Sequence, residues 1–189
     1  SGLLGIALDP EFSVNQWMYL HYAPMDFVGG RVSRFTLVNG LLDMGSEKIL
    51  LEYGEQRDNC CHHAGSMAFD GQGNLFVATG DNTYPAASGG FAPVDERPGR
   101  SVYDAQKSAG NTNDLRGKIL RIRPTPEGRY AIPEGNLFPT ASAIEGRPEI
   151  FVMGCRNPWR ISVDKVSNTL FWGEVGPDAG KNTGNRGPR

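Results

Sequence analysis

The sequence predicts an all-β chain that forms a segment of a β-propeller. Its 189 residues include 25 glycines and 13 prolines, which separate short apolar runs, and few windows have helical period. This pattern is typical of short strands joined by tight turns, with helix as a minor component. Three stretches also repeat one plan, in which an alternating strand ends in Asp and a short turn leads to a second strand. Such recurrence favours a repeated sheet unit, as in a propeller, over a sandwich.

The three repeated stretches are predicted β-hairpins. They join residues 5–9 to 17–22, residues 66–70 to 74–79, and residues 160–164 to 169–172. Aspartate suits the corner because its short carboxylate can accept hydrogen bonds from turn N–H groups, and a following Gly or Asn tolerates positive φ. Four further strands are predicted at 31–38, 47–52, 118–123 and 149–153. About ten strands at about four per blade make about two and a half blades, too few to close a ring.

The two ends of the chain indicate a segment of a longer protein. The first residues already have the pattern of a strand, and residues 185–189 lie in a Gly-rich stretch. We therefore expect residues 1–189 to form a partial propeller domain, with the missing blades supplied elsewhere and no second domain. Residues 81–116 interrupt the strand pattern with Pro, Gly, Asn and charged residues. Long loops inside compact domains are often functional, so we predict a rim insertion at about 81–116.

Composition and charge exclude several classes of partner. The formal net charge is −2, with both signs interspersed. No basic stripe is available to neutralise phosphates, so a nucleic-acid partner is not expected. No apolar run approaches the roughly 20 residues that a membrane span needs, and no signal peptide opens the chain. A signal peptide, if the protein has one, would precede Ser1.

The sequence Cys60-Cys61-His62-His63 stands directly before the predicted strand at 66–70 and points most strongly to chemistry. A histidine at the mouth of a strand can take a proton from a bound substrate, because imidazole exchanges protons near neutrality. The alternative for His62 is a rim histidine whose nitrogens bond to backbone carbonyls. For His63, and for His21 within an aromatic strand, the structural alternative is favoured.

The two adjacent cysteines allow three interpretations: free thiols, a vicinal disulfide, or metal ligands together with the histidines. Adjacent side chains diverge and seldom close one tetrahedral site, and zinc motifs separate paired ligands by two to four residues. In an oxidising compartment we favour a vicinal disulfide between Cys60 and Cys61, which would stiffen the chain entering His62. Cys155 is then an odd cysteine, expected to be buried and inert.

Several motifs follow one another in the order of a known family. They are Gly2-Leu3-Leu4-Gly5-Ile6-Ala7 with Asp9-Pro10-Glu11-Phe12, His62 with Gly65, Arg116-Gly117-Lys118-Ile119-Leu120-Arg121-Ile122, Ile132-Pro133 with Asn136, Arg156-Asn157-Pro158, and Gly173-Glu174-Val175-Gly176-Pro177. Together they resemble the glucose/sorbosone dehydrogenase family, whose members are soluble PQQ-dependent sugar dehydrogenases on six-bladed propellers. The Cys-Cys-His motif, with the insertion at residues 95–100, resembles a subgroup found in large bacterial multidomain oxidoreductases.

The resemblance implies site residues and cofactors. His62 would be the general base that takes the proton of the substrate hydroxyl while hydride moves to the quinone. Arg156 would stabilise the oxyanion that develops on the quinone, and Asn157 would hydrogen-bond the cofactor. The backbone carbonyls of Gly176 and Pro177 would ligate the Ca²⁺ that grips PQQ. The substrate would be a sugar or related alcohol, the electron acceptor a carrier such as a cytochrome c, and the location periplasmic or secreted.

The chain also departs from the family pattern. Cys61 stands where the family often has an acidic or polar residue before its histidine. A cofactor-contacting glutamine that commonly precedes the first motif would lie before Ser1, and the basic residues that hold the PQQ carboxylates would come from later blades. Propeller folds host many functions. A second class of function therefore stays open, a non-catalytic propeller that binds a glycan or a protein through the same rim.

Overall fold

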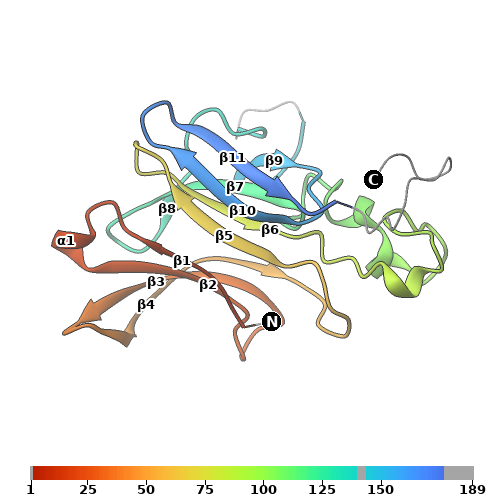
Figure 1. Ribbon diagram of the computed structural model, residues 1–189, viewed down its shortest axis with the longest axis horizontal. Helices are drawn as coiled ribbons and strands as arrows, with labels where there is room; N and C mark the ends of the chain where they lie inside the picture. The colour runs from red at the N-terminus through yellow and green to blue at the C-terminus, as the bar shows by residue number, and fades with distance from the viewer. Residues whose placement is uncertain (1, 140–143, 177–189) are drawn as a thin grey trace.

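The computed structural model describes residues 2–139 and 144–176, and in this part of the chain the strands form three antiparallel sheets (Figure 1). Helical structure there is limited to one four-residue α-helix, α1 (Phe12–Asn15), and three 3₁₀ turns. The predicted all-β fold class is confirmed. Within the same residues, no helix is long and apolar enough to cross a membrane.

The first sheet contains four strands in chain order. They are β1 (Leu3–Leu8), β2 (Trp17–Tyr22), β3 (Gly29–Val38) and β4 (Leu41–Gly54). The corner after β1 has the predicted aspartate contacts. Asp9 Oδ1 accepts the Glu11 N–H at 3.0 Å, and Asp9 Oδ2 accepts the Tyr19 hydroxyl at 2.8 Å. The carboxylate therefore ties the turn that contains α1 to the neighbouring strand β2.

The second and third sheets hold the other predicted strands. The second contains β5 (Ala64–Phe69), β6 (Leu75–Thr79), β7 (Lys118–Pro124), β8 (Tyr130–Ala131) and β9 (Ile150–Met153), and the third is the hairpin of β10 (Pro158–Asp164) and β11 (Thr169–Glu174). Strands β8 and β9 both pair with β7, near its opposite ends. Asp70 and Asp164 occupy the hairpin corners and accept hydrogen bonds from turn N–H groups, as predicted.

The hydrophobic core lies between the sheets, because the second sheet is apolar on both faces. Alternate residues of a strand point to opposite faces. Leu75 and Val77 of β6 accordingly join the core shared with the first sheet, whereas Phe76 and Ala78 join the core shared with the third. All residues of β6 are buried. Blades of a propeller stack face to face in this way.

The first strands of the sheets lie side by side, with β5 next to both β1 and β10. Two glycines permit the close approach of β1 and β5. A Cβ atom at Gly5 would lie 2.1 Å from the carbonyl oxygen of Gly65, and Gly65 has φ +116°. A side chain would clash at the first position and strain the backbone at the second. The close packing of β1 against β5 therefore explains why positions 5 and 65 are glycines.

The faces of β1 and β11 that point away from the second sheet carry exposed apolar side chains. Ala7 packs on the core, so its neighbours Ile6 and Leu8 point outwards, where they are about half exposed. Leu170 likewise packs on the core, and Phe171 points outwards. Side chains of this kind are those through which one blade packs against the next.

The predicted rim insertion lies between β6 and β7, and Figure 1 shows it beyond the ends of these strands. It contains three short 3₁₀ turns, η1 (Ala86–Ser88), η2 (Ser101–Tyr103) and η3 (Ala105–Lys107). Asp95 is buried at its centre, accepts two hydrogen bonds from Arg97 at 2.7 Å, and forms an ion pair with Arg100 at 3.4 Å. Its hydrogen bonds with Arg97 hold the pKa of Asp95 at about 2. The insertion is thus organised around one carboxylate.

Candidate functional site

One edge of the sheets gathers the loops that carry the predicted site residues. Strand β5 begins there and its antiparallel partner β6 ends there. Strand β7 begins at the same edge because it is antiparallel to β6. Hydrogen bonds join these loops to the turn before β10: the Asp81 N–H donates to the Arg156 carbonyl at 2.8 Å, and the Cys155 N–H donates to the Gly117 carbonyl at 3.0 Å. Residues far apart in sequence thus meet at one place.

His62 is held by a buried carboxylate. Its side chain is 8% exposed, and its Nδ1 lies 2.7 Å from Asp81 Oδ1. Asp81 is fixed in turn, because Thr83 donates its N–H to Oδ1 at 2.9 Å and its hydroxyl to Oδ2 at 2.7 Å. A carboxylate only accepts hydrogen bonds, so this contact assigns the proton of a neutral His62 ring to Nδ1. Nε2 then carries the lone pair that can take a proton.

Arg156 and Asn157 lie in the turn between β9 and β10, which the end of β11 holds in place. Glu174 Oε1 accepts the backbone N–H groups of Arg156 at 2.9 Å and of Asn157 at 2.6 Å. The Arg156 guanidinium donates from Nη1 to the Val175 carbonyl at 2.9 Å. One carboxylate therefore fixes the backbone of both predicted site residues.

The structure brings His62 and Arg156 to the same edge through Asp81. This residue binds the His62 ring through its side chain and the Arg156 carbonyl through its N–H. A second link is made by Asn157, whose Oδ1 accepts the Ala64 N–H at 3.1 Å. The Asn157 side chain thus bonds to the backbone two residues after His62. Its expected contact with a cofactor stays a prediction.

Gly80 lets the backbone of His62 approach the end of β6. A Cβ atom at Gly80 would lie 2.2 Å from the His62 carbonyl oxygen and 2.7 Å from the His63 nitrogen. The Gly80 N–H donates to the His63 carbonyl at 3.1 Å, and the Asn82 N–H donates to the His62 carbonyl at 3.0 Å. The two backbones therefore form a short ladder that has no room for a side chain.

The other two histidines have different partners. His63 Nδ1 lies 3.1 Å from Oε2 of Glu55, whose side chain is buried. His21 is buried in β2, where its Nε2 lies 2.7 Å from the Tyr53 hydroxyl and its Nδ1 lies 3.2 Å from the Gly65 carbonyl. Burial lowers the pKa of His21 to about 4. His21 therefore packs as a neutral side chain, in line with its predicted structural role.

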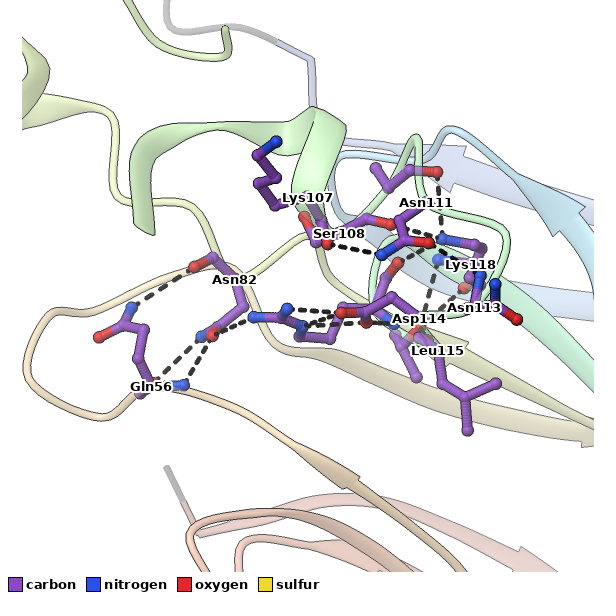
Figure 2. Close-up of polar contacts among 12 residues, drawn as sticks. Gln56, Asn82, Lys107, Ser108, Asn111, Asn113, Asp114, Leu115 and Lys118 are labelled. Carbon is purple, nitrogen blue, oxygen red and sulfur yellow. Dashed lines mark hydrogen bonds and ion pairs between the residues drawn. The ribbon is translucent and has the colours of Figure 1, made fainter. Parts of the chain in front are cut away.

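Asn82 joins the loop before His62 to the rim insertion, as Figure 2 shows for its contacts with Gln56. Asn82 Oδ1 accepts the Gln56 N–H at 2.8 Å, and Asn82 Nδ2 donates to the Gln56 carbonyl at 3.1 Å. Arg116 reaches the same Oδ1 from Nη1 at 3.3 Å. An ion pair with Asp114 at 2.5 Å holds Arg116. The side chain of Asn82 thus connects the loop before His62 to the start and the end of the rim insertion.

Lys118 holds the C-terminal end of the insertion through hydrogen bonds to its backbone. Its side chain is fully buried, and its Nζ donates to three backbone carbonyl oxygens. They belong to Ser108 at 2.8 Å, Ala109 at 3.1 Å and Arg116 at 2.8 Å. Burial lowers the pKa of Lys118 to about 8. A buried ammonium needs such acceptors, so the insertion is anchored on the start of β7.

The cysteines separate into a pair and a buried residue. Cys61 Sγ lies 2.7 Å from Cys60 Sγ, with Cys60 exposed and Cys61 partly buried. Cys155 is buried, and burial raises the pKa of its thiol to about 12, as expected for an inert thiol. Among the described residues, no group of three or more His, Cys, Asp or Glu side chains could hold a metal ion.

The residues at this edge fit the cofactor and cation that the resemblance implies. A Cβ atom at Gly176 would meet no other atom within 4 Å, so its backbone is not enclosed by neighbouring groups. The guanidinium of Arg156 suits an anionic quinone, and backbone carbonyl oxygens suit a hard cation such as Ca²⁺. Pro177, the second expected Ca²⁺ ligand, lies outside the described residues.

Sequence reasoning missed Asp81, which it assigned to the insertion, and the role of Glu174. A signal for Asp81 was available. His62 stands two residues before β5, and Asp81 stands two residues after β6. In an antiparallel pair these positions lie at the same end. No sequence signal indicated that Glu174 binds backbone N–H groups of residues 156 and 157.

The chain is similar in sequence to known dehydrogenases. The family described as Glucose / Sorbosone dehydrogenase matches residues 1–183. The chain is 28% identical over 182 residues to the Aldose sugar dehydrogenase YliI of Escherichia coli (strain K12), and this alignment covers 95% of the chain and 42% of that protein. It is 24% identical over 179 residues to the Hedgehog-interacting protein of Homo sapiens, covering 87% of the chain and 22% of that protein.

Two solved structures share the fold. The apo-form crystal structure of the soluble Aldose sugar dehydrogenase (Asd) from Escherichia coli has a TM-score of 0.65 and 27% identity, and the match covers 93% of this chain and 44% of that one. The PQQ-bound form of Aldose Sugar Dehydrogenase (Adh) from Streptomyces coelicolor has a TM-score of 0.63 and 23% identity, with coverages of 94% and 43%. The chain thus spans less than half the length of these relatives.

The comparisons agree with the predicted fold and motifs. The three sheets correspond to blades in a segment of a six-bladed propeller, as predicted. The family match runs through the motifs that carry His62, Arg156 and Gly176. On this sequence match and this fold, the chain belongs to the glucose/sorbosone dehydrogenase family.

Proposed function

We propose that the full-length protein is a PQQ- and Ca²⁺-dependent dehydrogenase that oxidises a hydroxyl group of a sugar or a related alcohol. The observation that carries this proposal is the pairing of His62 with the buried Asp81, beside the turn of Arg156, in a chain of this family. When bound, PQQ supplies a quinone that accepts hydride from the carbon bearing the hydroxyl. The chain itself supplies a proton acceptor, a positive charge and oxygen ligands.

In this proposal His62 takes the hydroxyl proton at Nε2. Asp81 accepts a hydrogen bond from Nδ1, which keeps the lone pair on Nε2 and stabilises the imidazolium once the proton has arrived. The two hydrogen bonds from Thr83 keep Asp81 in place before substrate binds. Such preorganisation supports a base role over that of a rim histidine bonded to carbonyls.

Arg156, Asn157, Gly176 and Pro177 would hold the cofactor and its cation. The guanidinium of Arg156 would offset the negative charge that develops beside it, an effect that is large where water is excluded. Asn157 would hydrogen-bond PQQ, and the carbonyl oxygens of Gly176 and Pro177 would bind Ca²⁺. The fixed backbone around Arg156 and Asn157 supports this assignment. A solved PQQ-bound dehydrogenase with the same fold is consistent with it.

Electrons would leave the reduced site to a carrier such as a cytochrome c. We place the protein in the periplasm or outside the cell, where disulfides persist. There Cys60 and Cys61 would form a vicinal disulfide, and the proximity of their sulfur atoms supports this pairing.

Spectral titration of the full-length protein with PQQ and Ca²⁺, followed by dye reduction with aldoses, tests the proposed function. We expect a quinone absorbance that saturates with PQQ and requires Ca²⁺, together with aldose-dependent dye reduction. An Asp81→Asn variant should bind PQQ but turn over at least about tenfold more slowly, because an amide can donate to Nδ1 and so stabilise the other tautomer. Absence of both the quinone spectrum and turnover would contradict the proposal.

A second candidate function is a propeller that binds a glycan or a protein through the same rim without catalysis. The similarity to the Hedgehog-interacting protein, whose name describes an interaction, favours this alternative. The rim insertion, with Asp95, Arg97 and Arg100 at its centre, could then contribute to the binding surface. The PQQ titration separates the two functions, because a binder of this kind would give no quinone spectrum.

A further inference from the structure

A pair of facing thiols stands immediately before the proposed base. Cys61 is the residue before His62, and its Sγ lies 2.7 Å from Cys60 Sγ. Cys60 is exposed, so a small oxidant or reductant can reach the pair. The third cysteine of the chain, Cys155, is buried with a pKa raised to about 12 and does not compete for such reagents. The reactive thiol chemistry of these 189 residues is therefore concentrated at positions 60 and 61.

The chain is anchored on both sides of the thiol pair. Before it, the Gln56 side chain closes a turn, because Gln56 Oε1 accepts the Asn59 N–H at 2.9 Å. Asn82 holds the Gln56 backbone through two hydrogen bonds (Figure 2). After the pair, the Asn82 N–H donates to the His62 carbonyl at 3.0 Å. Asn82 thus holds both ends of the short loop that contains Cys60 and Cys61.

This arrangement links the state of the sulfur atoms to the position of His62. Cys61 has φ 71°, so the chain turns sharply between the thiols and the imidazole. A thiol–thiol hydrogen bond is weak, because sulfur is a poor donor and a poor acceptor. A covalent S–S bond would instead hold the two side chains together for as long as it stays oxidised. Both ends of the loop are fixed on Asn82. Any change of backbone conformation that the S–S bond imposes must therefore fall mainly on residues 60 to 62.

We propose that Cys60 and Cys61 are a reversible redox modification site whose disulfide state holds His62 in its working position. Oxidation occurs by thiol–disulfide exchange with a low-molecular-weight disulfide such as oxidised glutathione. One cysteine thiolate attacks that disulfide and releases one small thiol, and the second thiolate then displaces the other. The two protons of the protein thiols pass to the two small thiols that are released, and the two electrons lost by the protein sulfurs reduce the small disulfide. The link to activity rests on the proposed function, but the link to the backbone does not.

Amide hydrogen exchange on the full-length protein tests the proposal independently of turnover. The reporters are the N–H groups of Asn82 and Gly80, which donate to the carbonyls of His62 and His63. The protein is equilibrated with reduced or oxidised glutathione, and mass spectrometry of the peptide that contains Cys60 and Cys61 reports loss of two hydrogen atoms on oxidation. We expect exchange at these two amides to be several-fold slower in the oxidised protein.

Turnover measured on the same two samples tests the functional consequence. We expect kcat for aldose-dependent dye reduction to fall about three- to tenfold on reduction, since a small displacement of a positioned base is costly, with PQQ binding unchanged. The Cys60→Ser variant should show neither the exchange difference nor the kcat difference. The Cys155→Ala variant, in which the pair is intact, should keep both. If that variant does not fold, alkylation mass mapping of the wild-type protein identifies which cysteines change state.

The oxidation, exchange and turnover measurements each test a different part of the proposal. Thiols that stay alkylatable in excess oxidised glutathione would overturn the proposal. Oxidation that leaves amide exchange at Asn82 and Gly80 unchanged would overturn the link to the backbone. Slower exchange with identical kcat in the two states would overturn the link to His62. An exchange difference in a protein without any quinone spectrum or turnover would instead contradict the proposed function and support the redox site.

Discussion

At the scale of single residues, the three histidines show how environment assigns different roles to one side chain. His62 is paired with the buried Asp81 and stands at the edge where the loops meet. His63 is paired with Glu55, which follows a different strand. His21 has no carboxylate among its hydrogen-bond partners, and burial holds it neutral. Of the three, His62 is the one that the family resemblance predicts to be a base, and its Nδ1 is paired with Asp81.

The burial of His21 predicts a pH dependence of stability. Its pKa is about 4 in the folded protein and 6.5 without burial. The unfolded chain therefore binds more protons between about pH 4 and pH 6.5, and the free energy of unfolding falls as the pH drops through this window. His21→Gln, which can still bond to Tyr53 and Gly65, should have a shallower slope there by up to one proton. Urea denaturation at several pH values measures this, and an unchanged slope would contradict the account.

At the scale of elements, the site depends on the backbone ladder between residues 62–63 and 80–82. This ladder extends the pairing of β5 with β6 past the last strand residues and carries Asp81 to the His62 ring. Gly80 is the position at which the two backbones are closest. The position of the His62 ring is thus set by main-chain packing as well as by its carboxylate partner.

A side chain at position 80 should therefore displace His62. Gly80→Ala places a methyl group 2.2 Å from the His62 carbonyl oxygen, so the loop must move. We expect kcat to fall by about a hundredfold, the order of loss that follows a misplacement of about 1 Å. Gly54→Ala is the matched control, because a Cβ atom there meets nothing within 4 Å. Steady-state kinetics of the full-length variants measures both, and equal kcat values would contradict the ladder's role.

The elements also show what the sequence could and could not predict. Alternating residues and Asp corners predicted the hairpins of β5 with β6 and β10 with β11 within about two residues, because period and turn chemistry are local signals. Strand β8 was missed because an alternation of apolar and polar residues cannot be recognised in only two residues. Strand β4 extends well beyond the predicted 47–52, and the extension includes Gly45 and Met44, which local propensity does not favour together.

The same limit applies to the site. His62 and Arg156 were predicted from motifs, and their meeting at one edge follows from strand pairing. Asp81 could have been found from the predicted β5–β6 hairpin, whose two ends bring positions 62 and 81 together, whereas Glu174 required the three-dimensional turn of residues 156–157. Partners that come from distant loops depend on tertiary packing, which a local pattern does not encode.

At the scale of the whole molecule, the described blades present faces suited to further blades. Phe171 is 59% exposed on the outward face of β11, although a large aromatic side chain gains most from burial. The solved relatives are more than twice as long as the part that this chain matches. A face of this kind is expected to be covered in a closed propeller.

A charge on this face should destabilise the full-length protein. Phe171→Lys would bury an unpaired ammonium between blades, and we expect a loss of about 3 kcal/mol or more in the free energy of unfolding. Val166→Lys is the control, because Val166 is 93% exposed in the turn before β11. Denaturation curves of both variants give the comparison. Similar stability for the two would show that the face of β11 stays open to solvent.

In the proposed function, the imidazole of His62, oriented by Asp81, is the proton acceptor of a quinone-dependent dehydrogenase. The most direct measurement is kcat for aldose-dependent dye reduction by the PQQ-loaded His62→Ala variant of the full-length protein. We expect kcat to fall by about two to four orders of magnitude, with the quinone absorbance retained. Turnover equal to that of the wild-type protein would contradict it.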